Sequence, residues 1–208
     1  MLAAVLLFIG CILIFIRIAD ENVLEKNYDF DTKVAAYVED HNSAGLVKAA
    51  EVISFFGSPP FLLSAYILLI LFMLWKGKKK YALGIAILGL SSRAVILILK
   101  EAFKRERPLI PSGEFVNEFS FPSGHTVSSF IFCGILLYFS WKLAWKLHWK
   151  MIIAIVLVLF SVAIAISRLV LNVHYATDVI AGLCLAIVWL LLSLFIMEKI
   201  RKKVPAAL

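Results

Sequence analysis

Long apolar runs alternate with short polar connections along most of the chain. Six runs can be read from the sequence, covering residues 2–19, 60–76, 81–99, 123–140, 151–168 and 179–197. Apolar residues follow one another within each run, instead of recurring every three or four positions as they do in a helix that buries one face. Several runs are slightly shorter than the ~20 residues of an untilted membrane helix, so we expect tilted helices or helices that extend beyond the runs.

The composition indicates the same class of protein. Of the 208 residues, 62% are hydrophobic and 17% are charged. A soluble domain is nearer half apolar and a quarter charged, and its core could not bury this many apolar side chains. We therefore predict an all-α integral membrane protein, in which residues 1–208 form a single domain of six transmembrane helices. The first run lacks a preceding basic segment, so we expect a retained helix in place of a cleaved signal peptide.

Basic residues are distributed unevenly over the connections. They gather after the second run, after the fourth run and in the C-terminal segment, as Lys76, Lys78, Lys79, Lys80, Lys142, Lys146, Lys150, Lys199, Arg201, Lys202 and Lys203. The connection after the first run is long and mainly acidic. Cytoplasmic segments are enriched in Lys and Arg, so we predict a multi-pass protein of the cytoplasmic membrane with both termini in the cytoplasm. The net charge of +7 is then explained by lipid head groups, and we expect no nucleic-acid binding.

Two connections carry further structural signals. Residues 30–57 have a weakly amphipathic pattern, which predicts one or two short helices along the outer membrane surface, ending at the breaker Gly57-Ser58-Pro59-Pro60. The segment WKLAWKLHWK at residues 141–150 repeats Trp every four positions. On one helix these tryptophans would form a stripe at the membrane interface.

Membrane anchoring leaves a set of polar residues unexplained. They occur where the third run ends, where the fourth begins, where the fifth ends and just before the sixth. In order they are Lys100, Arg107, Ser123, Gly124, His125, Arg168, His174 and Asp178. With the orientation above, all these positions lie at the outer ends of helices, so distant parts of the sequence meet at one face of the bundle.

The cations in this set favour binding of a multiply charged anion. Lys100, Arg107 and Arg168 are suited to phosphate, which Arg contacts through two parallel N–H groups. Ser123 and Gly124 open a helix, whose first N–H groups and positive dipole end attract anions. Glycine also permits close approach to the backbone.

The histidines add acid–base and nucleophilic chemistry. His174 and Asp178 are four residues apart, so the carboxylate can fix the imidazole tautomer and leave the other nitrogen as a nucleophile. His125 can protonate a leaving alkoxide as general acid. No carboxylate cluster suggests a metal. Cys11, Cys133 and Cys184 lie in apolar runs, and we expect them to form neither a disulfide nor a metal site.

Each polar residue also has a structural explanation when taken singly. A basic residue beside a span is commonly an anchor, and a His–Asp pair or an Arg can cap a helix. Arg93 lies inside the third run, where a charge is costly. It either pairs with a carboxylate beneath the site or marks a polar route for lipid head groups.

The spacing of this set resembles the three-part signature of the type-2 phosphatidic acid phosphatase superfamily. The matching segments are Lys100-x6-Arg107-Pro108, Pro122-Ser123-Gly124-His125 and Ser167-Arg168-x5-His174-x3-Asp178. The resemblance implies that His174 forms a phosphohistidine, Asp178 orients it and His125 protonates the leaving group. It also implies that Lys100, Arg107, Ser123, Gly124 and Arg168 hold the phosphate without a metal or other cofactor.

The same resemblance implies a lipid substrate at the outer face of the membrane. Similarity to small bacterial members of the superfamily favours hydrolysis of phosphatidylglycerophosphate to phosphatidylglycerol. Undecaprenyl diphosphate and phosphatidic acid are alternatives, and no obligatory protein partner is implied. A transporter or channel for anions is the alternative from another class, although such proteins favour internal repeats and midplane sites.

Overall fold

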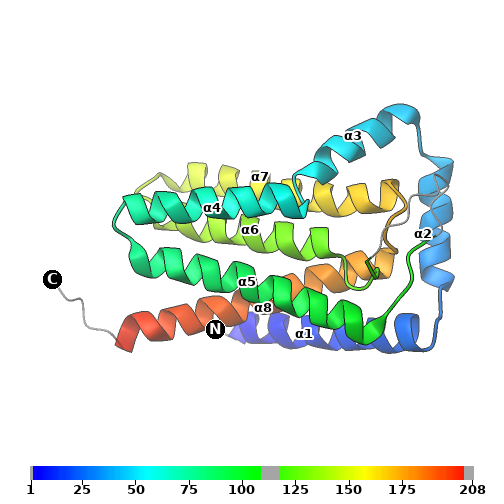
Figure 1. Ribbon diagram of the computed structural model, residues 1–208, viewed down its shortest axis with the longest axis horizontal. Helices are drawn as coiled ribbons and strands as arrows, with labels where there is room; N and C mark the ends of the chain where they lie inside the picture. The colour runs from blue at the N-terminus through cyan, green and yellow to red at the C-terminus, as the bar shows by residue number, and fades with distance from the viewer. Residues whose placement is uncertain (1, 109–117, 204–208) are drawn as a thin grey trace.

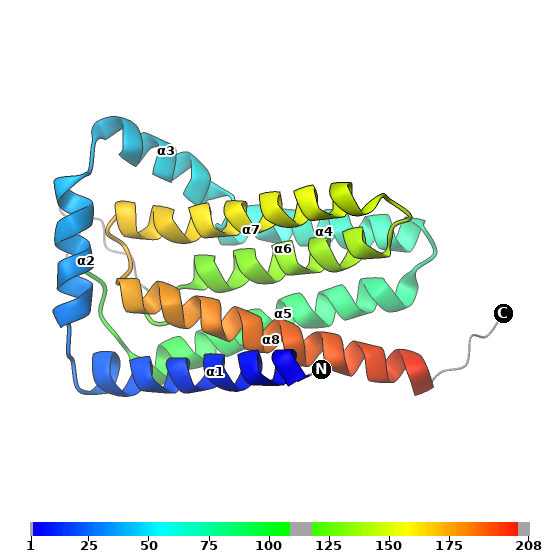
Figure 2. The same ribbon diagram turned by 180° about the vertical axis from the view of Figure 1, so that it is seen from behind.

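The computed structural model describes residues 2–108 and 118–203, and their side chains as far as residue 196 (Figures 1 and 2). In chain order its helices are α1 (Leu2–Ile18), the π-helical η1 (Ala19–Leu24), α2 (Asp29–Asp40), α3 (Ala44–Phe55), α4 (Pro59–Trp75), α5 (Lys79–Phe103), α6 (Gly124–Lys142), α7 (Leu147–Val170) and α8 (Ala176–Lys203). Six helical stretches in the described residues are long and apolar enough to cross a membrane. The predicted fold class, an all-α membrane protein with six spans, is confirmed.

Helices α5, α7 and α8 extend beyond the apolar runs at both ends, and local sequence explains several of the helix boundaries. Pro59 opens α4, which is the helical position where a missing N–H costs least. Ser123 caps α6, its side chain accepting from the Thr126 N–H. The left-handed conformation of Lys104, with φ of 47°, ends α5. These ends matter because the polar residues of the sequence lie beside them.

The long helices run along a common axis, and the short ones gather at one end (Figures 1 and 2). Helix α6 packs against α7 and α8, α1 packs against α8, and α4 packs against α5. Helix α2 crosses one end of the bundle, while α3 slopes from that end to meet α4 near its start. The α4–α5 and α6–α7 connections lie at the opposite end. One or two short helices were expected between the first two spans, and the structure has two, α2 and α3.

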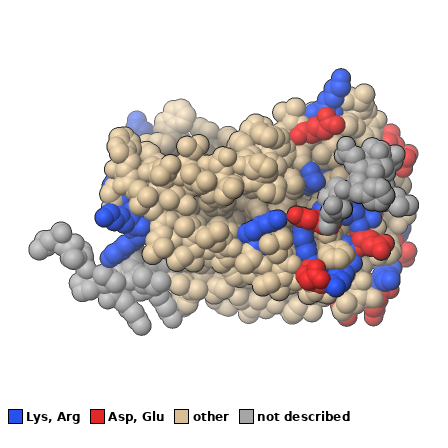
Figure 3. All heavy atoms as spheres, in the orientation of Figure 1, with Lys and Arg blue, Asp and Glu red and all other residues tan. Residues whose placement is uncertain are grey.

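Burial follows the pattern of a protein surrounded by lipid. Buried apolar side chains such as Ile96, Val127 and Ile131 form a narrow core between α5, α6 and α8. Leu, Ile and Phe side chains remain exposed on the outside of most long helices. Figure 3 shows charged side chains mainly at the two ends of one face, with both signs at the right end and, among the described side chains, basic groups alone at the left end. A basic group also interrupts the apolar region between the two ends.

The tryptophan-rich segment differs from its prediction. Trp141 lies on α6 and Trp149 on α7, while Trp145 lies in the connection between them. The single helical stripe predicted for these residues is therefore wrong. The chain has to reverse direction here because α6 and α7 are neighbours in the bundle. All three indoles are exposed, so they remain available to the membrane interface without sharing a helix.

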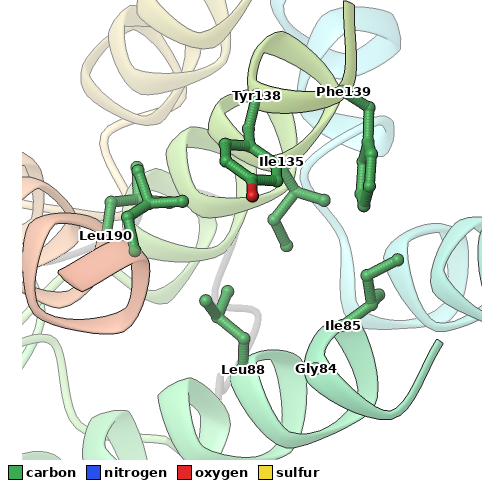
Figure 4. Close-up of a pocket in the computed structure, with 8 residues that line it drawn as sticks. Gly84, Ile85, Leu88, Ile135, Tyr138, Phe139 and Leu190 are labelled. Carbon is green, nitrogen blue, oxygen red and sulfur yellow. The ribbon is translucent and has the colours of Figure 1, made fainter. Parts of the chain in front are cut away.

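A pocket among α5, α6 and α8 is apolar (Figure 4). Its lining includes Ile85, Leu88, Ile135 and Leu190. These residues lie toward the end of the bundle where α5 begins and α6 ends, away from the predicted phosphate-binding residues. The pocket lining contains no charged side chain, so we regard it as a gap in helix packing.

Candidate active site

Helix ends bring the predicted site residues to one end of the bundle (Figure 1). Lys100 lies in the last turn of α5, and Ser123 to His125 open α6. Arg168 lies in the last turn of α7. His174 precedes α8, and Asp178 lies in its first turn. Four separate parts of the sequence thus contribute to the same region.

The geometry around His174 identifies its neutral tautomer. Its Nδ1 lies 3.3 Å from Asp178 Oδ2, and its Nε2 lies 3.2 Å from Arg107 Nη1. A guanidinium can only donate hydrogen bonds, so Nε2 must be the acceptor. The ring proton is then on Nδ1 and is donated to the carboxylate. This arrangement leaves the lone pair on Nε2, the nitrogen that faces Arg107, a predicted phosphate-binding cation.

His174 is also held neutral by its surroundings. Burial lowers its pKa to about 4, and the charges of Arg107 and Arg168 act in the same direction. The hydrogen bond and charge of Asp178 oppose this shift without reversing it. An unprotonated imidazole at neutral pH is the state that a nucleophile requires.

The other predicted groups lie close enough to interact electrostatically. His125 interacts with Arg168, His174, Arg107 and Lys100. It is packed so tightly against Gly57 that a Cβ on that glycine would lie 3.1 Å from His125 Cδ2. The ring of His125 makes no hydrogen bond within the described part of the chain. The predicted acid, nucleophile and cations therefore do converge.

Lys100 is buried and already bound to protein oxygens. Its Nζ donates to Phe119 O at 2.6 Å and to Glu118 Oε2 at 3.0 Å. Partial burial disfavours the ionised form of Glu118, but the hydrogen bond and charge of Lys100, with the charge of Arg93, lower its pKa overall. Glu118 is therefore an anion placed against a predicted phosphate ligand.

Ser123 and Gly124 occupy different environments. Ser123 is fully buried, with its N–H donating to Asp178 O at 3.1 Å and its hydroxyl accepting from Thr126 Oγ1 at 2.9 Å. Gly124 faces Lys100, whose Cε would lie 3.9 Å from a Cβ built on the glycine. The first N–H groups of a helix have no partner within the helix. Those of Gly124 and His125 therefore suit an anion better than Ser123, whose polar atoms are engaged.

Arg168 connects the site to the short helix α3. Its Nη1 donates to Ser54 Oγ, and Ser54 is buried. The Nε of Arg168 is buried without a hydrogen bond among the described residues. An unpaired donor on a buried guanidinium is costly, and a bound anion would satisfy it.

The structure adds a buried network that the sequence did not reveal. Arg105 donates to Asp178 Oδ1 at 2.6 Å, to Thr177 Oγ1 at 2.8 Å and to Asp31 Oδ2 at 2.7 Å. Asp31 in turn accepts from the N–H and hydroxyl of Thr177, at 2.9 and 2.7 Å. The guanidinium of Arg105 lies over the ring of Tyr175, 4.1 Å from its centroid. Both oxygens of Asp178 are thus fixed, one by Arg105 and one by the Tyr175 N–H and His174.

Sequence reasoning missed Arg105 because it lies in a segment dense with charge, KRERP, where only Arg107 fitted the spacing. Asp31 lies in the connection after the first run, which the sequence marks only as long and mainly acidic, yet it is only 2% exposed. One available signal was its position in the first turn of an amphipathic helix, but Asp29 shares that position and is exposed. Burial therefore had to come from the structure.

A sequence profile of the PAP2 superfamily matches residues 77–202. The chain belongs to the PAP2 superfamily. The match includes every predicted site residue and excludes Asp31. Within the described residues, no group of three or more His, Cys, Asp or Glu side chains could hold a metal ion.

Individual PAP2 proteins resemble the chain to different extents. Phosphatidylglycerophosphatase B of Bacillus subtilis (strain 168) is 31% identical over 113 residues, which is 54% of this chain and 56% of that protein. The chain thus matches little more than half the length of this relative.

Two solved structures share the fold. The transmembrane PAP2-type phosphatidylglycerolphosphate phosphatase from Bacillus subtilis superposes with a TM-score of 0.83 and 24% identity, covering 97% of this chain and 98% of that one. LpxE of Aquifex aeolicus gives a TM-score of 0.63 and 24% identity, covering 81% of this chain and 97% of that one.

Proposed function

We propose that the chain is a single-domain membrane phosphatase that hydrolyses lipid phosphates without a metal ion. The observation that carries the proposal is the environment of His174, whose Nδ1 meets Asp178 and whose Nε2 faces Arg107. A neutral imidazole with a fixed tautomer beside phosphate-binding cations is equipped for attack on phosphorus.

In the proposed first step, the lone pair on His174 Nε2 forms a bond to phosphorus. The bond from phosphorus to the lipid oxygen breaks, and His125 gives that oxygen a proton. Lys100, Arg107 and Arg168, with the N–H groups that open α6, neutralise the phosphoryl oxygens. Asp178 stabilises the positive charge that develops on His174.

In the second step, water attacks the phosphohistidine. His125 now accepts a proton from the water, the P–N bond breaks and inorganic phosphate leaves. Arg105 holds the second oxygen of Asp178 throughout, which keeps the carboxylate aimed at His174. The same two histidines thus serve both steps, and no redox or metal chemistry is needed.

We propose phosphatidylglycerophosphate as the leading substrate. Support comes from the 31% identical phosphatidylglycerophosphatase B and from the fold shared with a structure of that activity. Undecaprenyl diphosphate and phosphatidic acid remain the alternatives. A site at the helix ends, and not at the midplane, argues against the anion transporter.

We also propose that both termini are cytoplasmic and that the site faces outward. The lysine-rich α4–α5 and α6–α7 connections lie at the end of the bundle opposite the site (Figure 1). The basic side chains of the C-terminal segment, from Lys199 onward, lie outside the described side chains. The positive-inside rule gives the orientation.

The test is phosphate release from lipid phosphates in detergent with EDTA present. Replacing His174 by Ala should abolish turnover, and His125→Ala should reduce kcat by roughly 10²–10⁴-fold, the usual loss of a general acid. His148→Ala is the matched control, because this exposed histidine opens α7 at the opposite end. Full activity in His174→Ala, or an absolute need for added metal, would overturn the mechanism.

A further inference from the structure

Arg93 is a charged residue of α5 for which the proposed mechanism has no use. It lies seven residues before Lys100 on the same helix, so the two share a face and are separated by about 10 Å along the axis. Its side chain is 39% exposed, within a span where a charge is expensive and usually serves a function.

The contacts of Glu118 show that an anionic group fits between Arg93 and Lys100. Its Oε2 lies 3.0 Å from Lys100 Nζ, and its Oε1 lies 3.4 Å from Arg93 Nη2. One carboxylate therefore touches both cations at once. The distance to Arg93 is longer than the ~2.7–2.9 Å of a strong charged hydrogen bond, so Glu118 pairs poorly with this guanidinium.

A phosphate can displace the Glu118 carboxylate because this side chain is not tightly packed. Its side chain is 47% exposed, whereas that of Lys100 is 6% exposed. A phosphate that binds Lys100 has to displace this carboxylate. The displaced Glu118 would also release Arg93, which then lacks an anionic partner among the described residues.

The direction of α5 determines which part of a lipid would meet Arg93. Lys100 lies at the site end of the helix, and Arg93 lies two turns nearer its middle. The tail of a lipid substrate must come from the middle of the membrane. Any group between the reacting phosphate and the tail therefore lies on the Arg93 side of the site.

We propose that Arg93 binds the second phosphoryl group of a substrate that carries two, and thereby selects such lipids over simple phosphomonoesters. This inference rests on the proposed phosphatase function. The guanidinium presents two parallel N–H groups, the geometry that a phosphodiester or the inner phosphate of a diphosphate requires. Before the substrate binds, the carboxylate of Glu118 contacts both Arg93 and Lys100.

The experiment compares Arg93→Gln with wild type on matched lipids. One pair is phosphatidylglycerophosphate and phosphatidic acid with the same acyl chains, and the other is farnesyl diphosphate and farnesyl monophosphate. Lys104→Gln is the control, since this exposed lysine near the end of α5 pairs with Glu101. We expect kcat/KM to fall about tenfold or more for the two-phosphate member of a pair, and less than about twofold for its partner.

A second variant separates substrate binding from a structural role of the Arg93–Glu118 pair. Glu118→Gln removes the competing charge from Lys100 and should lower KM for both members of a pair. A purely structural pair would instead give Glu118→Gln and Arg93→Gln the same loss on every substrate. That result would overturn the assignment of Arg93.

The outcomes also separate this inference from the proposed function. No phosphate release by wild type from any of the four lipids would overturn the phosphatase itself. Activity with an unchanged preference in Arg93→Gln would overturn only the second phosphate site. A loss confined to phosphatidylglycerophosphate or to the diphosphate would support the site and identify how the two phosphates are joined.

Discussion

The two ring nitrogens of His174 differ in protonation, and the neighbouring side chains determine which one carries the proton. Asp178 accepts the proton on Nδ1, while Arg107 can only donate and so requires a lone pair on Nε2. The pair of contacts leaves one chemically useful protonation state. This state is also the one that burial favours, because a charged imidazolium would lose its hydration.

The pH dependence of kcat/KM should reveal this environment. With the pKa of His174 lowered to about 4 by burial, the nucleophile remains neutral down to that pH, whereas an ordinary histidine protonates near 6.5. Below about pH 4, kcat/KM should fall roughly tenfold per unit as Nε2 gains a proton. Rates between pH 3.5 and 8 check this, after correction for the substrate phosphate, which itself ionises near pH 6. A fall in kcat/KM near pH 6.5 that arises from a group on the enzyme would contradict the lowered pKa of His174.

At this scale the sequence predicted the pair of His174 and Asp178 but not the buried network beside it. The four-residue spacing typical of neighbours on a helix suggested this pair, although His174 lies just before α8. Arg105 and Asp31 could not be paired, because 74 positions separate them and no local periodicity links them. The use of Ser123 as a helix cap was likewise hidden, since the same residue also fits an anion site.

The short helix α2 connects two of the segments that carry predicted site residues. Asp31, in its first turn, is joined to Arg105 after α5 and to Thr177 at the start of α8. Each of these side chains is less than 5% exposed. Removing one partner of a buried ion pair leaves the other charge uncompensated, which usually costs more than the pair itself contributes.

Replacing Asp31 by Ala should therefore destabilise the fold. We expect the free energy of unfolding to fall by about 3–5 kcal/mol, because Arg105 would keep only Asp178 as a countercharge. Asp29→Ala is the matched control on the same turn of α2. Its carboxylate is exposed, and losing its interaction with the helix dipole should cost less than about 1 kcal/mol. Thermal unfolding in detergent measures both variants, and equal transition temperatures would contradict the role of Asp31.

The elements themselves were largely predictable from hydropathy. Six apolar runs gave six spans because a helix is the only open structure that satisfies its own backbone in lipid. The helix ends were less predictable, since Lys79 and Phe103 lie outside the apolar run of α5. The break between Trp141 and Trp149 was missed because their four-residue spacing is also good helical spacing.

The whole molecule is polarised along the bundle axis. Lysine-rich connections occupy one end, while acidic and basic groups mix at the other (Figure 3). The predicted catalytic groups lie at the mixed end. In the proposed orientation, a lipid phosphate in the outer leaflet meets the cations without its head group crossing the membrane.

Labelling of single cysteines in intact cells should establish the proposed orientation. Asp40 at the end of α2 and Lys79 at the start of α5 are exposed and lie at opposite ends. We expect a membrane-impermeant maleimide to label Asp40→Cys in whole cells and Lys79→Cys only after the membrane is opened. Wild type is the control, because its three cysteines are buried. The reverse pattern would place the site in the cytoplasm.

The buried contact between Asp31 and Thr177 has a consequence for how the protein is made. The two residues are 146 positions apart, an interval that a ribosome translates in about 7–30 s at 5–20 residues per second. During that time the carboxylate of Asp31 has to stay hydrated, because burying it alone would be too costly. Helix α2 can therefore pack onto the bundle only after the first residues of α8 have been synthesised. A chain that still lacks α8 therefore cannot form the buried contacts of Asp31, and this end of the bundle is assembled only when Thr177 is present.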